Sequence, residues 1–564
     1  MKTNLWKLLI VLVVSAMVVP GLAGCKPAAT PTEAPVAEPT EALVAEPTEA
    51  PVEAEPVTLR IGTTYIWDTA NPTYGWYGYN LRYLLYDTLI EWTEVDLFEP
   101  NLAESWQVSD DGLVWTFTIR EGVTFHDGTP CTAEEIAWNL NWAQEMEIET
   151  YSFYLYNFEE VVALDKTTLQ VTLSDPVGNM EYLLVFVWIL PPSVWQDMTY
   201  DEIMEFEDLS AGMGTGPYRL VDWVEGESLV LEANENYWRG APAVDRVIWQ
   251  EYATEDAMVQ ALLAGEVDVI DDIPGTAIQT LQDEENIEVL IMPTLTIEEL
   301  IINSHENGTQ PESLNDPEVR LAIEYAVNRE EIIDVAYLGY GEPAGVVIPP
   351  GMGDFHNSDV EVIPFDPAEG NRILDQAGYL DTDGDGIRED ADGNPLAYRL
   401  YAEDTATYAR VLEIISDGLA EIGISAPPTV MDEDALIGLY PDFDFDLIYW
   451  GWGLDPDPDF AMLIFACDER EEGGWNDSGY CNEDFDAMYF EQAVTVDHDA
   501  RRQLIWDMQA QLYEDRPYIM VVYLPNFQAY RSDRFTGFGL DAARSQGTDS
   551  ITWKWAFLQA EPVQ

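Results

Sequence analysis

Apolar and polar positions alternate with two different periods along the chain after residue 56. Residues 57–62 and 113–120 place an apolar side chain at every second position, which is the spacing of a β-strand with one buried face. Residues 81–90 instead carry apolar side chains at helical spacing. Because segments of both kinds follow one another along the chain, the pattern predicts an α/β fold with parallel and mixed sheets.

Several helix boundaries can be predicted from capping residues. Thr132 followed by Glu135 forms a capping box, so a helix is expected to begin at residue 133. Asp316 followed by Pro317 has the residue types preferred at the N-cap and at the first helical position. Asn328 provides a further N-cap for the helix after that one.

The first 25 residues have the pattern of an export signal. Two lysines precede an apolar run over residues 8–19, which is shorter than the ~20 residues that span a bilayer. The run is followed by Leu-Ala-Gly and then Cys25, which resembles a bacterial lipobox. We therefore predict a signal peptide over residues 1–24 and lipidation of Cys25, which becomes the anchored N-terminus. The alternative is ordinary cleavage after small residues.

Residues 25–56 carry an eight-residue repeat that is rich in proline and glutamate. The repeats TPTEAPVA, EPTEALVA and EPTEAPVE begin at residues 30, 38 and 46. Proline in every repeat excludes a helix, and the glutamates repel one another. The segment is expected to be an extended tether between the lipid anchor and the globular part, or else a tolerated disordered tail.

Length, charge and missing motifs limit the possible functions. With 564 residues, the chain exceeds the size of one hydrophobic core, so more than one lobe is expected. The formal charge of −82 argues against nucleic acid as a partner and against binding to an anionic membrane surface. HExxH, GxSxG and P-loop motifs are absent from the sequence, so we expect no enzyme. A secreted hydrolase that uses a carboxylate pair is the alternative, because acidic residues are abundant.

Six segments in a fixed order carry a family resemblance. They are LAESWQVSDDGLVWTFTIREGVTFHDGTPCTAEEIAWNL from residue 102, GTGPYRLVDW from 214, NENYWRGAPAVDRVIWQ from 234, ALLAGEVDVID from 261, DPEVRLAIEYAVNREEII from 316 and FDPAEGNRILDQAGY from 365. Together they resemble the solute-binding proteins of peptide-type ABC importers, extracytoplasmic family 5. The similarity covers nearly all of residues 57–564.

The resemblance implies an architecture and a function. The implied fold is of the two-lobed periplasmic-binding-protein type, with hinge strands and an additional inserted domain. Carried over to this sequence, lobe I comprises residues 57–80, 210–297 and 524–564, the small domain residues 81–209, and lobe II residues 298–523. The implied function is closure of the lobes around an oligopeptide, which is then delivered to the ABC permease subunits in the membrane. Relatives that bind oligosaccharides are the alternative, and a monomer outside the cytoplasm is expected.

Two aromatic clusters are candidate ligand contacts. Tyr74 and Trp76 lie in a glycine-rich loop after the first predicted strand, and Trp450 and Trp452 lie in the segment YWGWGLDPDP. In the family, an acid that follows the second cluster can hold the free amine of a peptide, and alignment on Trp452 assigns this role to Asp455. Alignment on the following Asp-Pro pair instead places it one residue earlier, which leaves the amine anchor open. The alternative for the tryptophans is packing at the hinge.

An acidic loop has the residue spacing of a calcium-binding EF-hand loop. Oxygen ligands are expected at its positions 1, 3, 5, 7, 9 and 12, and the glycine at position 6 permits a sharp turn. These six positions are Asp381, Asp383, Asp385, Ile387, Glu389 and Asp392. The loop therefore predicts a structural Ca²⁺ site, with an acidic surface turn as the alternative; no cofactor is otherwise required.

The remaining cysteines divide into one pair and one single residue. Cys467 and Cys481 flank a glycine-rich loop in an exported protein, which predicts a disulfide, with two reduced thiols as the alternative. Cys131, between Pro130 and the predicted helix, is expected to be a small buried residue.

Overall fold

The computed structural model describes residues 56–65, 69, 71–73, 79–93, 97–306, 308–471, 473–538 and 554–563. The predicted signal peptide, Cys25, nearly all of the tether, Tyr74 and Trp76 lie outside the described residues. The names lobe I, small domain and lobe II are used below for the residue ranges given above.

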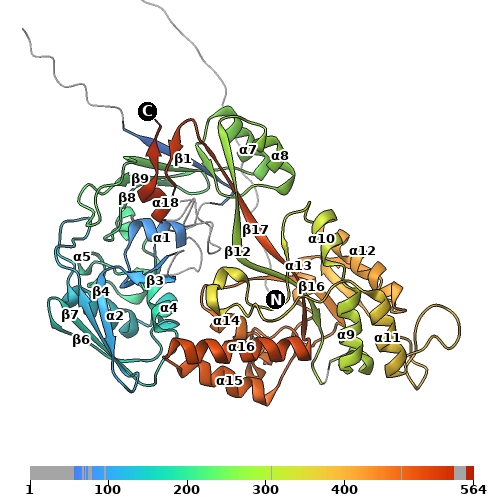
Figure 1. Ribbon diagram of the computed structural model, residues 1–564. Helices are drawn as coiled ribbons and strands as arrows, with labels where there is room; N and C mark the ends of the chain where they lie inside the picture. Colours follow the sequence, from blue (N-terminus) through green and yellow to red (C-terminus); the bar gives the residue numbers. More distant parts are fainter. Residues whose placement is uncertain are drawn as a thin grey trace, which may run out of the picture. The chain divides into compact units, whose positions relative to one another are not determined.

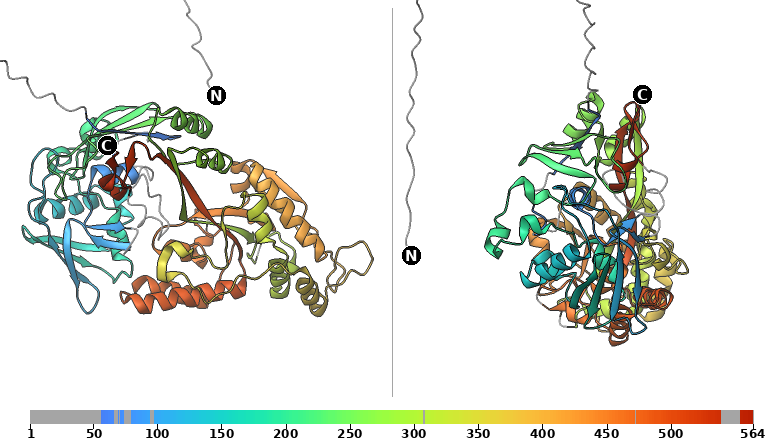
Figure 2. Two further views of the ribbon diagram at one scale, coloured as in Figure 1. Left: turned by 45° about the horizontal axis from the view of Figure 1, so that its top comes forward. Right: turned by 90° about the vertical axis from the view of Figure 1, so that its left-hand side faces the viewer.

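One large mixed sheet runs through lobe I and lobe II (Figure 1). In spatial order its strands are β15 (Pro428–Met431), β14 (Leu400–Glu403), β16 (Leu447–Gly453), β12 (Ile287–Ile302), β17 (Tyr518–Arg531), β11 (Val269–Ile270), β1 (Thr58–Thr63), β10 (Arg246–Glu251), β9 (Ser228–Ala233) and β8 (Tyr218–Val224), with β13 (Glu342–Pro343) paired to β17. β12 and β17 are antiparallel and lie side by side along their length (Figures 1 and 2). These two strands connect the part of the sheet in lobe I to the part in lobe II.

The small domain contains a separate antiparallel sheet. Its strands, in spatial order, are β4 (Ala103–Val108), β5 (Val114–Ile119), β7 (Thr168–Leu173) and β6 (Phe158–Asp165). Trp115, Phe117 and Ile119 of β5 are buried, as their alternation predicts. The core they belong to also contains Leu59 and Trp249 of lobe I, so the small domain and lobe I share one core.

Shorter elements complete lobe I and the small domain. They are α1 (Tyr79–Leu85), β2 (Ile90–Thr93), β3 (Leu97–Pro100), α2 (Ala133–Glu145), α3 (Glu149–Ser152), α4 (Met180–Val185), α5 (Pro192–Trp195), α6 (Tyr200–Met204), α7 (Glu255–Ala264), α8 (Ile278–Gln282), β18 (Phe535–Thr536), α18 (Lys554–Gln559) and β19 (Glu561–Pro562). Of the helices in the described part of the chain, none combines the length and apolar content that crossing a bilayer requires.

Lobe II has two cores, one on each face of its part of the sheet. Leu300 and Tyr449 belong to one core, and their strand neighbours Ile301 and Ile448 belong to the other. The helices of lobe II are α9 (Pro317–Ala326), α10 (Arg329–Val335), α11 (Pro367–Ala377), α12 (Ala406–Glu421), α13 (Glu433–Ile437), α14 (Pro458–Leu463), α15 (Glu483–Val494) and α16 (His498–Asp515).

The predicted capping residues are confirmed. The capping box of Thr132 and Glu135 begins α2, and the side chain of Asp316 accepts a hydrogen bond from the backbone at the start of α9. Asn328 caps α10 in the same way. Cys131 is buried, as predicted.

The helix predicted over residues 81–90 is wrong in its second half. α1 ends at Leu85, and β2 begins at Ile90. Between them, Asp87 is fully buried and its carboxylate accepts a hydrogen bond from the ammonium of Lys554, 2.6 Å away. The apolar spacing alone would extend the helix to residue 90, but in the structure the chain leaves the helix before Asp87, where this acid pairs with Lys554.

Candidate solute-binding site

Trp450 and Trp452 project from the same face of β16. In the antiparallel ladder with β12, Trp450 lies opposite Glu299, and Trp452 lies opposite Ile297. Both tryptophans are partly buried and pack against the lobe II core that contains Ile301. They thus combine hinge-side packing with some exposed aromatic surface.

A third tryptophan extends this aromatic surface. The ring of Trp475 makes edge-on contacts with Trp452 and with Phe460, at centroid distances of 6.2 and 5.6 Å. Its side chain is 52% exposed, which is unusual for so large an apolar residue. The sequence pattern does not single out Trp475; its position between the two paired cysteines is the only signal that could have pointed to it.

A disulfide closes the loop that presents Trp475. Cys467 and Cys481 are bonded, and their Cα atoms are 4.6 Å apart. Inside the loop, the side-chain amide of Asn476 donates to the backbone carbonyls of Ala466 and Tyr480. The bond and these contacts hold Trp475 next to Trp452.

Asp455 connects lobe II to the small domain. The hydroxyl of Tyr182, on α4, donates a hydrogen bond of 2.7 Å to Oδ2 of Asp455. Burial raises the pKa of the Asp455 carboxyl above its ordinary value. An ammonium group brought beside this carboxyl would favour its ionised form, so Asp455 has the chemistry of an amine anchor.

A buried ion pair fixes the chain that follows Asp455. The guanidinium of Arg501 donates two hydrogen bonds to the carboxylate of Asp457, at 2.6 and 2.7 Å. Asp457 is also the N-cap of α14. A second contact between the small domain and lobe II lies near Arg501, where the backbone NH of Gly178 donates to the carbonyl of Ala493 at 2.8 Å.

Two consecutive glutamates of β12 are buried on opposite faces of the sheet. Oε1 of Glu298 accepts a hydrogen bond from the hydroxyl of Tyr408 at 3.1 Å, and burial raises the pKa of Glu298 to about 8. Neither carboxyl oxygen of Glu299 has a hydrogen-bond partner among the described residues. These glutamates were not predicted as site residues, although two acids in an otherwise apolar strand are a recognisable signal.

The hinge strands also border a cavity of about 470 Å³. It is lined by Ile291 and Thr294 of β12, by Tyr523 of β17 and by Tyr340. Trp450, Trp452 and Asp455 do not line this cavity, so it is separate from the aromatic site.

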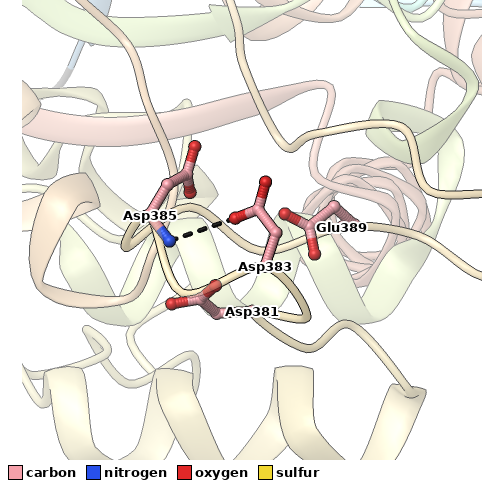
Figure 3. A group of neighbouring side chains, drawn as sticks. All are labelled: Asp381, Asp383, Asp385 and Glu389. Carbon is pink, nitrogen blue, oxygen red and sulfur yellow. Dashed lines mark hydrogen bonds between the residues drawn. The ribbon is translucent and has the colours of Figure 1, made fainter.

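Four acids of the predicted calcium loop converge (Figure 3). Carboxylate oxygens of Asp381, Asp383, Asp385 and Glu389 all lie within 4.8 Å of one another. Glu389 is buried, and its Oε2 accepts hydrogen bonds of 2.8 Å from the backbone NH and the hydroxyl of Thr382. A cluster of carboxylate oxygens fits a hard divalent cation.

The other two predicted ligands of this loop are Asp392 and the backbone carbonyl of Ile387. Asp392 is exposed and is not a member of the group. Its backbone NH donates to Asp390, in a turn of its own. Ile387 lies between Asp385 and Glu389 in the sequence, and its backbone NH donates to the carboxylate of Asp385 at 2.8 Å.

Comparisons with known proteins identify the family. The model described as bacterial extracellular solute-binding proteins, family 5 Middle, matches residues 98–473. The glutathione-binding protein GsiB of Escherichia coli (strain K12) is 27% identical over 449 residues, which cover 78% of this chain and 82% of GsiB. GsiB of Shigella flexneri matches with the same identity and coverage.

Solved structures show the same fold. The ABC transporter substrate-binding protein CtaP of Listeria monocytogenes superposes with a TM-score of 0.75 at 23% identity, covering 90% of this chain and 99% of CtaP. The oligopeptide-binding protein AppA of Bacillus subtilis, solved with a nonapeptide, gives a TM-score of 0.67 at 23% identity and covers 90% of this chain and 100% of AppA. These structures confirm the predicted fold of the periplasmic-binding-protein type.

The fold and its hinge strands define an extracytoplasmic solute-binding protein of the kind that works with ABC permeases. The chain belongs to family 5 of the bacterial extracellular solute-binding proteins. GsiB and AppA are named for the solutes that they bind, which are glutathione and oligopeptides.

Proposed function

We propose that this protein is the substrate-capturing lipoprotein of an ABC importer and that it binds an oligopeptide by hinged closure. The observation that carries the proposal is the convergence of Trp450, Trp452, Trp475 and Asp455 at the end of β16, where Tyr182 of the small domain meets lobe II. Aromatic faces with few polar groups are typical of solute sites. The nonapeptide bound by the similar AppA supports a peptide ligand.

Closure requires that the solute bind the closed arrangement better than the open one. The hydrogen bond between Tyr182 and Asp455 joins the two parts that would enclose the solute. Since β12 and β17 are the strands that link the lobes through the sheet, rotation about them would make or break this contact. A solute held against Asp455 would therefore contact both the small domain and lobe II.

The N-terminal residues would keep the protein at the membrane. In this proposal, residues 1–24 direct export, Cys25 carries the lipid, and the repeats before residue 56 form the tether. The mature protein would act as a monomer that delivers its solute to the permease subunits. Intact-mass measurement of the membrane-extracted protein tests the lipid at Cys25.

An oligosaccharide is the second candidate ligand, because three neighbouring tryptophans would also suit stacking on sugar rings. Mass spectrometry of solute released from the purified protein by denaturation separates the two candidates. A hydrolase would return a supplied peptide or oligosaccharide in cleaved form, whereas a binding protein would return it unchanged.

Replacing Asp455 by asparagine is expected to weaken peptide binding by about 2–5 kcal/mol, because a buried ammonium would lose its charged partner. The binding of a neutral oligosaccharide would be nearly unchanged, whereas Trp452→Ala would weaken it strongly. Calorimetry of each variant against a peptide library and β-linked oligosaccharides measures both effects. The exposed Asp468 provides the control Asp468→Asn, and unimpaired peptide binding by Asp455→Asn would refute the amine-anchor role.

We also propose that the cluster of Asp381, Asp383, Asp385 and Glu389 holds a structural Ca²⁺. The convergence of four carboxylates near the end of α11 supports this, because four like charges so close together would otherwise repel one another. Calcium bound to the folded loop would stabilise lobe II through mass action.

Calcium at a hundredfold excess over its dissociation constant is expected to add about 2.7 kcal/mol to the free energy of unfolding. Differential scanning calorimetry of calcium-loaded protein, before and after chelation, measures the difference. Asp383→Ala should abolish the response, whereas Asp417→Ala, which removes an exposed acid from α12, should retain it. An unchanged melting temperature on chelation would exclude the site.

A further inference from the structure

Lobe II contains two buried acids that no cation of the described residues balances. The side chain of Glu299 is fully buried, and neither of its carboxyl oxygens has a hydrogen-bond partner among the described residues. Oδ2 of Asp477 and the hydroxyl of Tyr440 are buried without a partner in the same way. Within the described ranges, no lysine or arginine forms an ion pair with Glu299 or Asp477. A buried polar group without a hydrogen-bond partner destabilises the folded state. We therefore expect a bound molecule to supply the partner of these acids.

This cluster lies beside the tryptophans of the proposed solute site. Glu299 is directly opposite Trp450 in the ladder of β12 and β16 and therefore shares its face of the sheet. The indole NH of Trp452 donates to the hydroxyl of Tyr518 at 3.3 Å, and that hydroxyl donates in turn to Asp477. The two acids are thus connected to the partly exposed tryptophans, one through the sheet and one through a hydrogen-bond chain.

The chemistry of the cluster specifies its partner. Carboxylates form their strongest hydrogen bonds with ammonium and guanidinium groups, and tryptophan faces attract the same cations. Among the described residues, the only group of three or more acids, histidines or cysteines close enough to hold a metal is the calcium loop, so Glu299 and Asp477 belong to no such group.

We propose that the solute of this protein carries an ammonium or guanidinium group, which binds between Glu299 and Asp477 against Trp450 and Trp452. The proposal rests on the proposed function, because it assumes that the tryptophans of β16 contact the solute. It adds a second cationic group, such as a lysine or arginine side chain, to the terminal amine that the oligopeptide proposal assigns to Asp455. Asp455 would keep the terminal amine or its contact with Tyr182.

The electrostatics of the cluster add an observable consequence. Burial raises the pKa of Glu299, and the charge of Asp477 raises it further. Burial also raises the pKa of Asp477 to about 7, although the hydrogen bonds from Tyr518 and Trp452 oppose that change. The other titratable groups that interact with these acids are Tyr408, Tyr440, Tyr518 and Glu298. Since a cation favours the ionised carboxylates, its binding would release their protons to the buffer.

The test is titration calorimetry of the purified protein at pH 6 with two matched pairs of solutes. One pair is the peptides Ala-Lys-Ala and Ala-Met-Ala, which share the terminal amine and differ in the charge of the central side chain. The other pair is cadaverine and 1,5-pentanediol. The cationic member of a pair is expected to bind about tenfold tighter or more, and its binding should release protons, measured by comparing buffers with different ionisation enthalpies. Glu299→Gln and Asp477→Asn should each remove the preference. Glu298→Gln, which changes the buried acid on the opposite face of β12, is the matched control and should retain it.

Each outcome decides the proposal. Peptide binding without a preference for the charged member would overturn the cation site and leave the oligopeptide function standing. A preference for cadaverine that depends on Glu299, without binding of either peptide, would support the cation site and overturn the oligopeptide function. A preference that survives both substitutions, or no binding of either cation, would overturn the cation site. Because both peptides bring the same terminal amine to Asp455, the additional protons released with Ala-Lys-Ala report on the second cationic group. This difference is measured on the unmodified protein, so it decides the matter even where a variant fails to fold.

Discussion

Replacing Lys554 by methionine is expected to lower the free energy of unfolding by about 3–5 kcal/mol, because it leaves the buried carboxylate of Asp87 without a counter-charge. The ammonium of Lys554, on α18, lies 2.6 Å from a carboxylate oxygen of Asp87 and 2.7 Å from one of Glu91. All three side chains are almost completely inaccessible to solvent. Burial alone would lower the pKa of Lys554, but the two carboxylates raise it above its ordinary value.

The surrounding contacts explain why this effect should be large. The carboxylate of Asp87 also accepts hydrogen bonds from Thr215 and Trp238, at 2.9 and 3.0 Å, and Glu91 pairs with Arg239 at 2.9 Å. The cluster therefore joins α18 to residues of the small domain and of lobe I that are far away in the sequence. Without Lys554, Asp87 would retain neutral donors only, and its ionised form would lose most of its stabilisation.

Urea denaturation, followed by circular dichroism, measures the change in unfolding free energy. The exposed Lys166 provides the matched control, since Lys166→Met removes the same charge from the surface and should change stability by only about 0.5 kcal/mol. If both variants unfolded at the same urea concentration, the ion cluster would not stabilise the protein as argued.

Raising the pH from 5 to 8.5 is expected to destabilise the protein, and Glu298→Gln should remove roughly 4 kcal/mol of this loss. Burial raises the pKa of Glu298 from 4.5 to about 8, while the hydrogen bonds from Tyr408, Tyr449 and Tyr337 act in the opposite direction. The protonated carboxyl is thus favoured in the folded state, whereas the unfolded chain ionises near its ordinary pKa. This contribution to stability is fully present below pH ~4.5 and is lost as the pH rises to about 8.

Thermal denaturation across this pH range compares the variant with the unmodified protein. The net charge of −82 also destabilises the folded protein, because its acidic residues repel one another more strongly as the pH rises. Any substitution that removes one negative charge, including one at the surface, reduces this repulsion slightly. Glu421→Gln, at an exposed position at the end of α12, is therefore the matched control. An identical pH dependence in Glu298→Gln and Glu421→Gln would contradict the argument. Glu299 and Asp477 remain in both variants, so part of the loss should persist.

Local features of this protein could be predicted from neighbouring residues. The capping boxes, the β5 strand and the buried Cys131 each depend on a few adjacent side chains, and the structure confirms them. The ordered family segments were enough to predict the fold class and the family, both of which the comparisons confirm. The acidic loop also folds locally, since its carboxylates accept hydrogen bonds from backbone groups a few residues away.

The composition of the candidate site could be predicted only in part. Trp450, Trp452 and Asp455 were recognised by their resemblance to a family motif, but their partners come from distant parts of the chain. Tyr182 is 273 positions from Asp455, and no sequence period connects the two. Trp475 and Asp477 are placed by the disulfide loop, whose position relative to β16 depends on the packing of the whole lobe.

The sequence by itself determined where several helices begin, which face of β5 is apolar, and to which family the chain belongs, because these properties depend on local spacing and on ordered motifs. Only the tertiary structure decided which charged groups meet. In the folded chain, α1 ends before Asp87, and Asp87 pairs with Lys554. Glu299 lies opposite Trp450, and its carboxyl has no hydrogen-bond partner among the described residues. The physical reason is that the free energy of a buried charge depends on all the groups around it. These groups come from distant segments, which only the packing of the whole chain brings together.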